Sequence, residues 1–374
     1  MTTSIETKTK TETEATRVRN GYESPCAIVA TATAVPEHTI SREDVKLYLG
    51  RVFDIPERRL EAMMSIVDNA QVHSRQMIFP LDYTIQSRSL EKTNQEYMQH
   101  AIELGRRAAE ECLQRAGMTP QDIDMIITVS CTGFMIPSLD AHLINLMGFR
   151  SDVRRMPFTE LGCAAGAMAL GRASDYLQSR ADGNVLIIAV ELPSLTFQRK
   201  DISQANLISS ILFGDGAAAV IVSGKKSASG PRILVSETYT FPDSLGAMGF
   251  DLKDSGFHIL LSKDVPEMIG ERIEGLVDGF LSRHGVTRDQ IRGWILHPGG
   301  SRLLGNVEKA LGLSKCDTQP SWDVLGNVGN LSSATVLFIL QEWMEKRPLK
   351  KGDIAMAAAF GPGFSAEFLL LQWN

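Results

Sequence analysis

Residues 161–170 read Leu161-Gly162-Cys163-Ala164-Ala165-Gly166-Ala167-Met168-Ala169-Leu170, which places a cysteine between a glycine and a run of small, helix-forming residues. This pattern is typical of a nucleophile at a turn between a strand and a helix. The unpaired N–H groups and the dipole of a helix N-terminus favour an anion, so we expect a lowered pKa for the Cys163 thiol. Most cysteines are small buried hydrophobic residues instead, and this stretch alone leaves that interpretation open.

The composition bounds the class of protein. The chain has 374 residues, enough for two domains or two halves of one. Its net charge of −6 offers no basic surface for nucleic acid or anionic lipid, and no apolar stretch is long enough to span a membrane. Residues 1–24 are rich in Thr, Glu and Lys and lack the apolar core of a signal peptide, so we expect a disordered tail there.

The cysteines indicate a compartment. They are widely spaced and odd in number, and none forms a CxxC pair: Cys26, Cys112, Cys131, Cys163 and Cys316. This spacing argues against a disulfide framework and against a zinc site, and it favours a reducing cytoplasm. We expect no bound metal ion and no cofactor.

An internal repeat predicts the architecture. Helical and strand patterns alternate along the chain, which implies an α/β fold with a mostly parallel sheet and helices on both faces. Residues 117–127 match residues 285–295 without a gap, and residues 212–216 are echoed by residues 359–363. Cys163 and Asn330 follow the first pair of copies at nearly the same distance. We therefore predict a duplicated unit, with halves at 25–225 and 226–374 and with Cys163 and Asn330 at equivalent helix starts.

The duplication predicts one shared site. A pseudo-two-fold axis would bring the two helix starts together, and His297 lies at the end of the repeated strand. Ligands of open α/β sheets gather at the carboxyl ends of strands. Cys163, His297 and Asn330 are therefore expected to converge.

This trio is compatible with two reactions. In a papain-like protease, the Cys attacks, the His is the base and the Asn orients the His; the mid-chain position of Cys163 and the duplication argue against it. In carbon–carbon bond formation from thioesters, the Cys163 thiolate, paired with the His297 imidazolium, would accept an acyl group. His297 and Asn330 would then donate hydrogen bonds to the enolate oxygen that develops as a malonyl thioester loses carbon dioxide.

Several motifs carry a family resemblance: Leu161 to Gly166, Leu212-Phe213-Gly214-Asp215-Gly216-Ala217-Ala218, His297-Pro298-Gly299-Gly300, Gly329 to Ala334, and Phe360-Gly361-Pro362-Gly363. With them, the chain from about Pro25 to Asn374 resembles the type III polyketide synthases, the chalcone and stilbene synthase family of the thiolase-like superfamily. The resemblance implies a thiolase-like, duplicated five-layer αβαβα fold with pseudo-two-fold symmetry. It also implies a homodimer that acts on acyl-CoA and malonyl-CoA.

The resemblance carries roles over by position. Cys163 would be the nucleophile, His297 and Asn330 the pair that stabilises the enolate, and Phe213 the gatekeeper between the coenzyme A tunnel and the cavity. The second gatekeeper aromatic of plant enzymes falls at Ile259, an aliphatic residue. The remaining positions implied to line the cavity are Cys131, Ile136 (reaching across a dimer interface), Pro193, Thr196, Phe250 and Ser332. Arg75 and Arg302 are candidates for contact with coenzyme A phosphates.

The expected function is polyketide synthesis from an acyl-CoA starter, with a weak preference for a fatty acyl chain. The product would be an alkylpyrone, an alkylresorcinol or a related phenol. One alternative is a ketoacyl synthase III that makes a single condensation on an acyl carrier protein. Another is an inactive homologue that serves as a binding partner, although the intact trio argues against it.

Overall fold

The computed structural model describes residues 26–53, 55–347 and 349–374. The tail predicted over residues 1–24 lies outside this range. No helix of the described ranges is long and apolar enough to cross a membrane.

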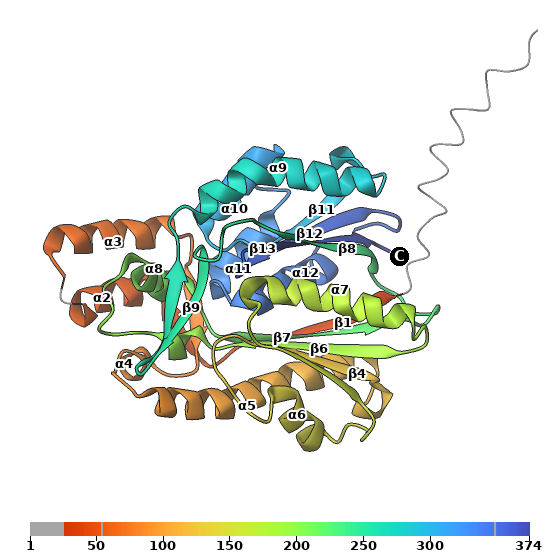
Figure 1. The fold of residues 1–374 in the computed structure, drawn as a ribbon, viewed down its shortest axis with the longest axis horizontal. Coiled ribbons are helices and arrows are strands. Elements are labelled where there is room, and N and C mark those ends of the chain that lie inside the picture. The colour runs from red at the N-terminus through yellow and green to blue at the C-terminus, as the bar shows by residue number, and fades with distance from the viewer. Residues whose placement is uncertain (1–25, 54, 348) are drawn as a thin grey trace, which may run out of the picture.

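A nine-stranded sheet forms the centre of the described structure (Figure 1). Its strands are β1 (Ala27–Ala34), β4 (Met125–Val129), β5 (Arg154–Phe158), β6 (Asn184–Glu191), β7 (Gly216–Ser223), β8 (Arg232–Thr240), β11 (Ile291–Leu296), β12 (Ile354–Gly361) and β13 (Ser365–Gln372). The order across the sheet is β11-β12-β13-β8-β1-β7-β6-β4-β5.

The strand order confirms the predicted duplication, because the same arrangement occurs twice. The series β4-β6-β7-β1 in the first half corresponds to β11-β12-β13-β8 in the second, and β5 is added at one edge. The halves meet where β1 and β8 run antiparallel and Ala27 pairs with Arg232. The division predicted between residues 225 and 226 lies in the connection from β7 to β8.

The helices make three further layers. Helices α7 (Ala165–Gln178) and α12 (Thr335–Glu345) lie between the two halves of the sheet and share one apolar core with their inner faces. Helices α5 (Leu90–Ala116) and α6 (Leu139–Met147) cover the outer face of the first half. Helices α9 (Val265–Arg283) and α10 (Ser301–Leu311) cover the second. Figure 1 shows this sequence of layers from α5 and α6 to α9 and α10, and it confirms the five-layer fold.

The remaining elements lie at the end of the molecule where Cys163 is found. They are β2 (His38–Ser41), α2 (Arg42–Val52), α3 (Glu57–Asn69), β3 (Ser74–Met77), α4 (Leu81–Thr84), α8 (Gln204–Leu212), β9 (Met248–Lys253), β10 (Gly256–Leu261) and α11 (Gln319–Val328). Strands β9 and β10 form an antiparallel hairpin. Helices α2, α3 and α8 share a smaller apolar core.

The prediction of a mostly parallel sheet is wrong. Parallel pairs join β4 to β5, β4 to β6 and β11 to β12, but the other pairs of the large sheet are antiparallel. The link from β12 to β13 shows the reason, because only residues 362–364 connect them. A parallel pair needs a crossover of a dozen or more residues. A link this short can only produce a hairpin, in which the two strands are antiparallel.

The repeat itself is confirmed in the backbone. Gly117 and Gly285 have left-handed φ angles of 63° and 65°, and a capping box follows each of them, at Thr119 and at Thr287. The predicted equivalence of Cys163 and Asn330 is wrong, however. Gly162 and Ser332 share a φ of about 50°, three residues before α7 and α12 respectively. The residue equivalent to Cys163 is therefore Ser333.

Candidate active site

Cys163 lies in a single 3₁₀ turn, Gly162–Ala164, that leads directly into α7. The turn needs glycine at 162, because φ is 50° there and a Cβ would lie 2.6 Å from the Pro362 ring. The thiol is buried, and Sγ lies 3.5 Å from Ser332 Oγ. The Cys163 thiol is thus held at the start of α7, a helix that is packed between the two halves of the sheet.

Asn330 comes to the same place from the other half. Its Oδ1 accepts hydrogen bonds from Ser332 N (2.8 Å) and Thr335 Oγ1 (3.3 Å), and these donors fix the orientation of the amide. Nδ2 donates to the Gly299 carbonyl at 3.0 Å. Because an amide nitrogen carries two hydrogens, one remains for a ligand.

His297 follows β11 and is also buried. Its Nδ1 has no hydrogen-bond partner among the described residues, and the amide of Asn330 donates to Gly299 rather than to the imidazole. A papain-like site needs the Asn to orient the His. This arrangement therefore does not support the protease interpretation.

Two cavities meet at Cys163. The larger, of about 510 Å³, is lined by Cys163, His297 and Asn330 and reaches Lys263 and Arg302 at its outer part. We call it the entry cavity. The smaller, of about 270 Å³, lies on the other side of Cys163 and is called the inner cavity.

Cys163, Phe213 and Met248 line both cavities. The backbone on either side of Phe213 is fixed to Asn330. Asn330 N donates to the Leu212 carbonyl (2.9 Å), and Gly214 N donates to the Asn330 carbonyl (3.1 Å). Phe213 therefore stands at the boundary where the sequence placed a gatekeeper. Met248 is a second boundary residue, which sequence reasoning missed.

The electrostatics correct one expectation. Burial raises the pKa of the Cys163 thiol to about 12, against the lowering expected from the helix N-terminus. Moving a thiol pKa from 9 to about 12 costs about 4 kcal/mol, whereas a helix terminus contributes at most about 2 kcal/mol. Burial also lowers the pKa of His297 to about 4. Both groups are therefore neutral at pH 7 in the empty site.

Alkylation of Cys163 should consequently be slow at neutral pH. Only the thiolate reacts, and its fraction rises about tenfold per pH unit below the pKa. We expect the rate of carbamidomethylation of Cys163 by iodoacetamide to rise steadily from pH 6 to pH 10, as measured by peptide mass spectrometry. The exposed Cys316 serves as the internal reference. A plateau below pH 8 would show that the thiol is already ionised, contrary to this expectation.

The predicted cavity residues are distributed unevenly. The inner cavity is lined by most of them: Cys131, Pro193, Thr196, Phe213, Phe250, Ile259 and Ser332. Ile136 is 79% exposed and does not line the cavities of its own chain near Cys163. Arg302 lines the outer part of the entry cavity and pairs with Glu267 at 2.5 Å. Its contact with coenzyme A stays a prediction.

The role predicted for Arg75 is wrong. The side chain is buried, and its two terminal nitrogens donate to the carbonyls of Ser210 and Ile211 at the end of α8. No phosphate can reach a guanidinium that already caps a helix inside the protein. Arg75 instead holds the last turn before Phe213.

Asp215 holds the other side of Phe213. Its buried carboxylate accepts from Ile78 N (2.9 Å), Ser194 N (2.9 Å) and Ser194 Oγ (2.5 Å). Burial raises the pKa of Asp215 to about 6, and the charge of Arg75 acts against that rise. Arg75 and Asp215 together fix the Phe213 turn from both ends.

Replacing Arg75 by methionine should therefore destabilise the fold. The substitution leaves the carbonyls of Ser210 and Ile211 without their buried donor, and each buried acceptor that is left unsatisfied costs about 1–3 kcal/mol. We expect a loss of this size in the free energy of unfolding, measured by urea denaturation. Arg302→Met is the matched control, with an expected change within about 0.5 kcal/mol, since its side chain is 67% exposed. Equal effects of the two substitutions would contradict this role for Arg75.

Two further site residues escaped the sequence reasoning. Glu191 is fully buried at the end of β6 and accepts hydrogen bonds from Cys131 N (3.1 Å), Thr132 Oγ1 (2.9 Å) and Ser333 Oγ. The sequence signal for Glu191 was a lone carboxylate at the end of an apolar strand.

Phe257 lines the inner cavity and packs edge-on against Phe250, with the ring centroids 5.7 Å apart. Because strand residues alternate in direction, Phe257 shares the cavity face with Ile259. The cavity face of β10 thus carries an aromatic residue, two positions before Ile259, where plant enzymes have their second gatekeeper.

Chemically, the site offers a nucleophile, a neutral imidazole and an amide donor in a largely apolar enclosure. Among the described residues, no group of three or more His, Cys, Asp or Glu side chains is placed to hold a metal ion. Such a site suits covalent acyl transfer followed by stabilisation of an oxyanion.

Comparison with known proteins agrees with this chemistry. The models of the N-terminal and C-terminal domains of chalcone and stilbene synthases match residues 13–226 and 233–373. The chain is 35% identical to a 1,3,6,8-tetrahydroxynaphthalene synthase of Streptomyces peucetius, over 93% of each chain. It is 33% identical to a phloroglucinol synthase of Pseudomonas fluorescens, over 91% of this chain and 97% of the relative.

A solved structure agrees over nearly the whole length. The bacterial type III polyketide synthase 1,3,6,8-tetrahydroxynaphthalene synthase of Streptomyces coelicolor superposes with a TM-score of 0.89 at 34% identity, covering 93% of this chain and 99% of that one. The order of the strands, the position of Cys163 at the start of a central helix and both domain matches point to one conclusion. The chain belongs to the chalcone and stilbene synthase family, the type III polyketide synthases, and is a decarboxylating, condensing acyltransferase.

Proposed function

We propose that this enzyme loads an acyl group from an acyl-CoA starter onto Cys163 and extends it with malonyl-CoA. The extended chain then cyclises to an alkylpyrone, an alkylresorcinol or a related phenol. The names of two relatives, a tetrahydroxynaphthalene synthase and a phloroglucinol synthase, support a phenolic product. No cofactor beyond the coenzyme A thioesters is required.

One observation carries the proposal: Cys163 lines both the entry cavity and the inner cavity. A thioester enters through the first, and the acyl chain held on the sulfur extends into the second. Cys163 Sγ attacks the thioester carbonyl and the thiol proton moves to His297. The bond between the carbonyl carbon and the coenzyme A sulfur then breaks, and coenzyme A takes this proton from His297 and leaves as the thiol. Because both groups are neutral beforehand, the proton moves during the attack.

The condensation step uses the other two members of the trio. Malonyl-CoA loses carbon dioxide, and the electron pair of the broken bond forms an enolate whose oxygen accepts hydrogen bonds from His297 and from the free N–H of Asn330. The enolate carbon attacks the carbonyl of the acyl-Cys163 thioester, and the Cys163 sulfur leaves. The Phe213 ring at the boundary disfavours the malonyl carboxylate and so assists its loss.

We also propose a cytoplasmic homodimer. Ile136 and Phe134 are 79% and 55% exposed on the loop before α6, which suits apolar side chains that reach a second copy. The free thiols of Cys131 and Cys163 suit a reducing compartment. Arg302 and Lys263, at the outer part of the entry cavity, are our candidates for the coenzyme A phosphates.

The test is incubation of the purified protein with malonyl-CoA and acyl-CoAs from acetyl to palmitoyl. Mass spectrometry follows the small products and any adduct on Cys163. Pyrones or phenols together with acylated Cys163 are the expected result. Untouched malonyl-CoA and unmodified Cys163 would refute the proposal.

A further inference from the structure

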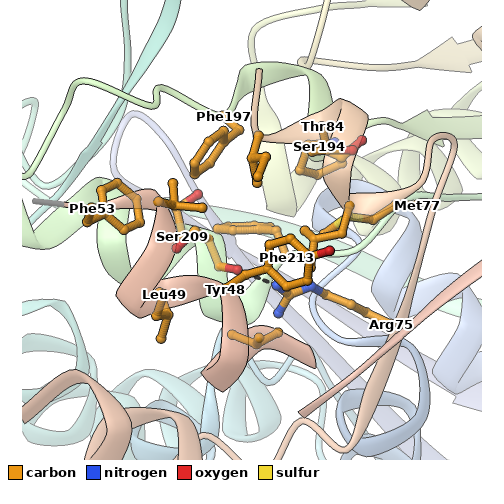
Figure 2. Close-up of a pocket in the computed structure, with 16 residues that line it drawn as sticks. Tyr48, Leu49, Phe53, Arg75, Met77, Thr84, Ser194, Phe197, Ser209 and Phe213 are labelled. Carbon is orange, nitrogen blue, oxygen red and sulfur yellow. Dashed lines mark hydrogen bonds between the residues drawn. The ribbon is translucent and has the colours of Figure 1, made fainter. Parts of the chain in front are cut away.

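A third cavity of about 50 Å³ lies beneath helix α2 (Figure 2). We call it the side chamber. It is lined mainly by residues of α2, α4, α8 and β3 and of the turn at Pro193–Thr196. In Figure 2, Leu49 and Phe53 lie on one side, Met77 and Arg75 lie on the other, and Phe213 lies between them. The function proposed above gives it no role.

The side chamber adjoins the inner cavity. Pro193, Ser209 and Phe213 line both spaces. Phe213 also borders the entry cavity, so the three spaces meet around one aromatic ring. An acyl chain attached to Cys163 and directed into the inner cavity therefore has the side chamber next to it.

The surface of the side chamber is apolar. Val45, Leu49, Val52, Phe53 and Phe197 contribute aliphatic and aromatic side chains. The first three project from the buried face of α2, and the aromatic rings of the other two pack edge-on, with their centroids 5.8 Å apart.

Its polar side chains mostly bond within the protein. Tyr48 Oη donates to Asp82 (2.6 Å), Ser194 Oγ to Asp215 (2.5 Å), and Ser210 Oγ to the Leu207 carbonyl (2.7 Å). Arg75 Nε has no partner among the described residues, and the Ser209 side chain adds a further hydroxyl to the lining. A polyketide chain carries a carbonyl on every second carbon, and those oxygens would lose hydrogen bonds to water in such a space. A hydrocarbon would lose none.

The size of the side chamber limits its occupant. Its volume of about 50 Å³ is less than a fifth of the inner cavity's 270 Å³, so it admits the end of a hydrocarbon chain and no long segment of it.

Building on the proposed function, we propose that the side chamber binds the methyl end of a short or medium straight-chain acyl starter. Leu49 and Tyr48 on α2 then set the length of the starter. The proposal narrows the fatty acyl starter expected from the sequence to the shorter chains of that class.

The experiment compares starters from acetyl-CoA to dodecanoyl-CoA in the full-length enzyme, with kcat/KM for product formation and acylation of Cys163 measured together. Leu49→Trp fills the side chamber and should lower kcat/KM for octanoyl-CoA by about tenfold or more relative to acetyl-CoA, because one methylene in a fitted pocket changes kcat/KM by about 10–200-fold. Leu49→Ala should move the preferred starter to a longer chain. Leu47→Trp is the matched control, since Leu47 lies on the same helix, is 53% exposed and does not line the side chamber.

Tyr48→Ala is the second variant. It opens the side chamber from a half-buried position and should also favour longer starters, even if substitution of the buried Leu49 impairs folding. If Leu49→Trp and Tyr48→Ala leave the preference for length unchanged while Cys163 is still acylated, the side chamber has no role in starter binding. The proposed function would survive that result, whereas absence of Cys163 acylation with every starter would refute the function itself.

A polar-ended starter tests the chemistry of the side chamber. Octanoyl-CoA should be used more efficiently than 8-hydroxyoctanoyl-CoA by about tenfold or more, since the hydroxyl would lose its hydrogen bonds to water. A preference for the hydroxylated starter would show that Arg75 Nε binds a polar end, and it would overturn the proposal.

Discussion

Replacing Cys163 by alanine is expected to abolish both acylation of the enzyme and formation of any product. The acyl group has to be carried by a nucleophile that lines both the entry cavity and the inner cavity, and of the three residues that line both, only Cys163 is a nucleophile. The other two, Phe213 and Met248, cannot form a thioester by acyl transfer. Intact-protein mass spectrometry after incubation with an acyl-CoA, and product analysis after addition of malonyl-CoA, measure the two losses.

Cys316→Ala controls for the loss of a thiol as such. Cys316 is exposed, and its replacement should leave acylation and product formation unchanged. Persistence of an acyl adduct on Cys163→Ala would show that a different residue carries the chain, and the assignment of the nucleophile would fail.

Replacing Asn330 by aspartate is expected to slow the loss of carbon dioxide from malonyl-CoA by about 10²–10³-fold, because one oxyanion-hole donor contributes about this much. The substitution keeps the size of the side chain and an oxygen for Ser332 N, which Asn330 Oδ1 accepts at 2.8 Å. It replaces the N–H that would face the enolate by a second oxygen, which repels the developing charge. Release of carbon dioxide from malonyl-CoA, assayed without a starter, measures the effect.

Two companion measurements separate this role from a general one. Acylation of Cys163 should be affected far less than decarboxylation, because Asn330 enters the proposal only at the condensation step. Asn327→Asp, at an exposed position in the same segment, should leave both steps unchanged. Equal loss of acylation and decarboxylation in Asn330→Asp would mean that the substitution disrupts the site as a whole.

The sequence predicted that Cys163, His297 and Asn330 converge because an internal repeat relates the two halves of the chain, and all three line the entry cavity. The backbone at Gly117 and Gly285 repeats to within a few degrees of φ, and so the copies that suggested a duplication are copies in three dimensions. Pairing the two halves then required that the helix after Cys163 meet the helix after Asn330. The cavity residues Pro193, Thr196 and Phe250 followed from the resemblance and do line the inner cavity.

Other features could not be predicted from local patterns. Arg75 looked like an exposed cation that could meet a phosphate, yet it is buried against the end of α8, a segment far away in the sequence. The pKa of Cys163 depends on burial, which a helix-start motif does not report. Glu191 acquired its role only through partners at Cys131 and Ser333, each distant along the chain.

The sequence by itself determined the duplicated α/β architecture, the family, and the convergence of Cys163, His297 and Asn330, because each depends on the order and spacing of residues along the chain. The tertiary structure alone decided the charge state of Cys163, the antiparallel pairs of the sheet, the task of Arg75 and the existence of the side chamber. Each of these depends on burial, or on contacts between segments far apart in the chain. The free energy of a charge or of an apolar group is set by the atoms that surround it, and the surroundings become defined only when the chain is folded.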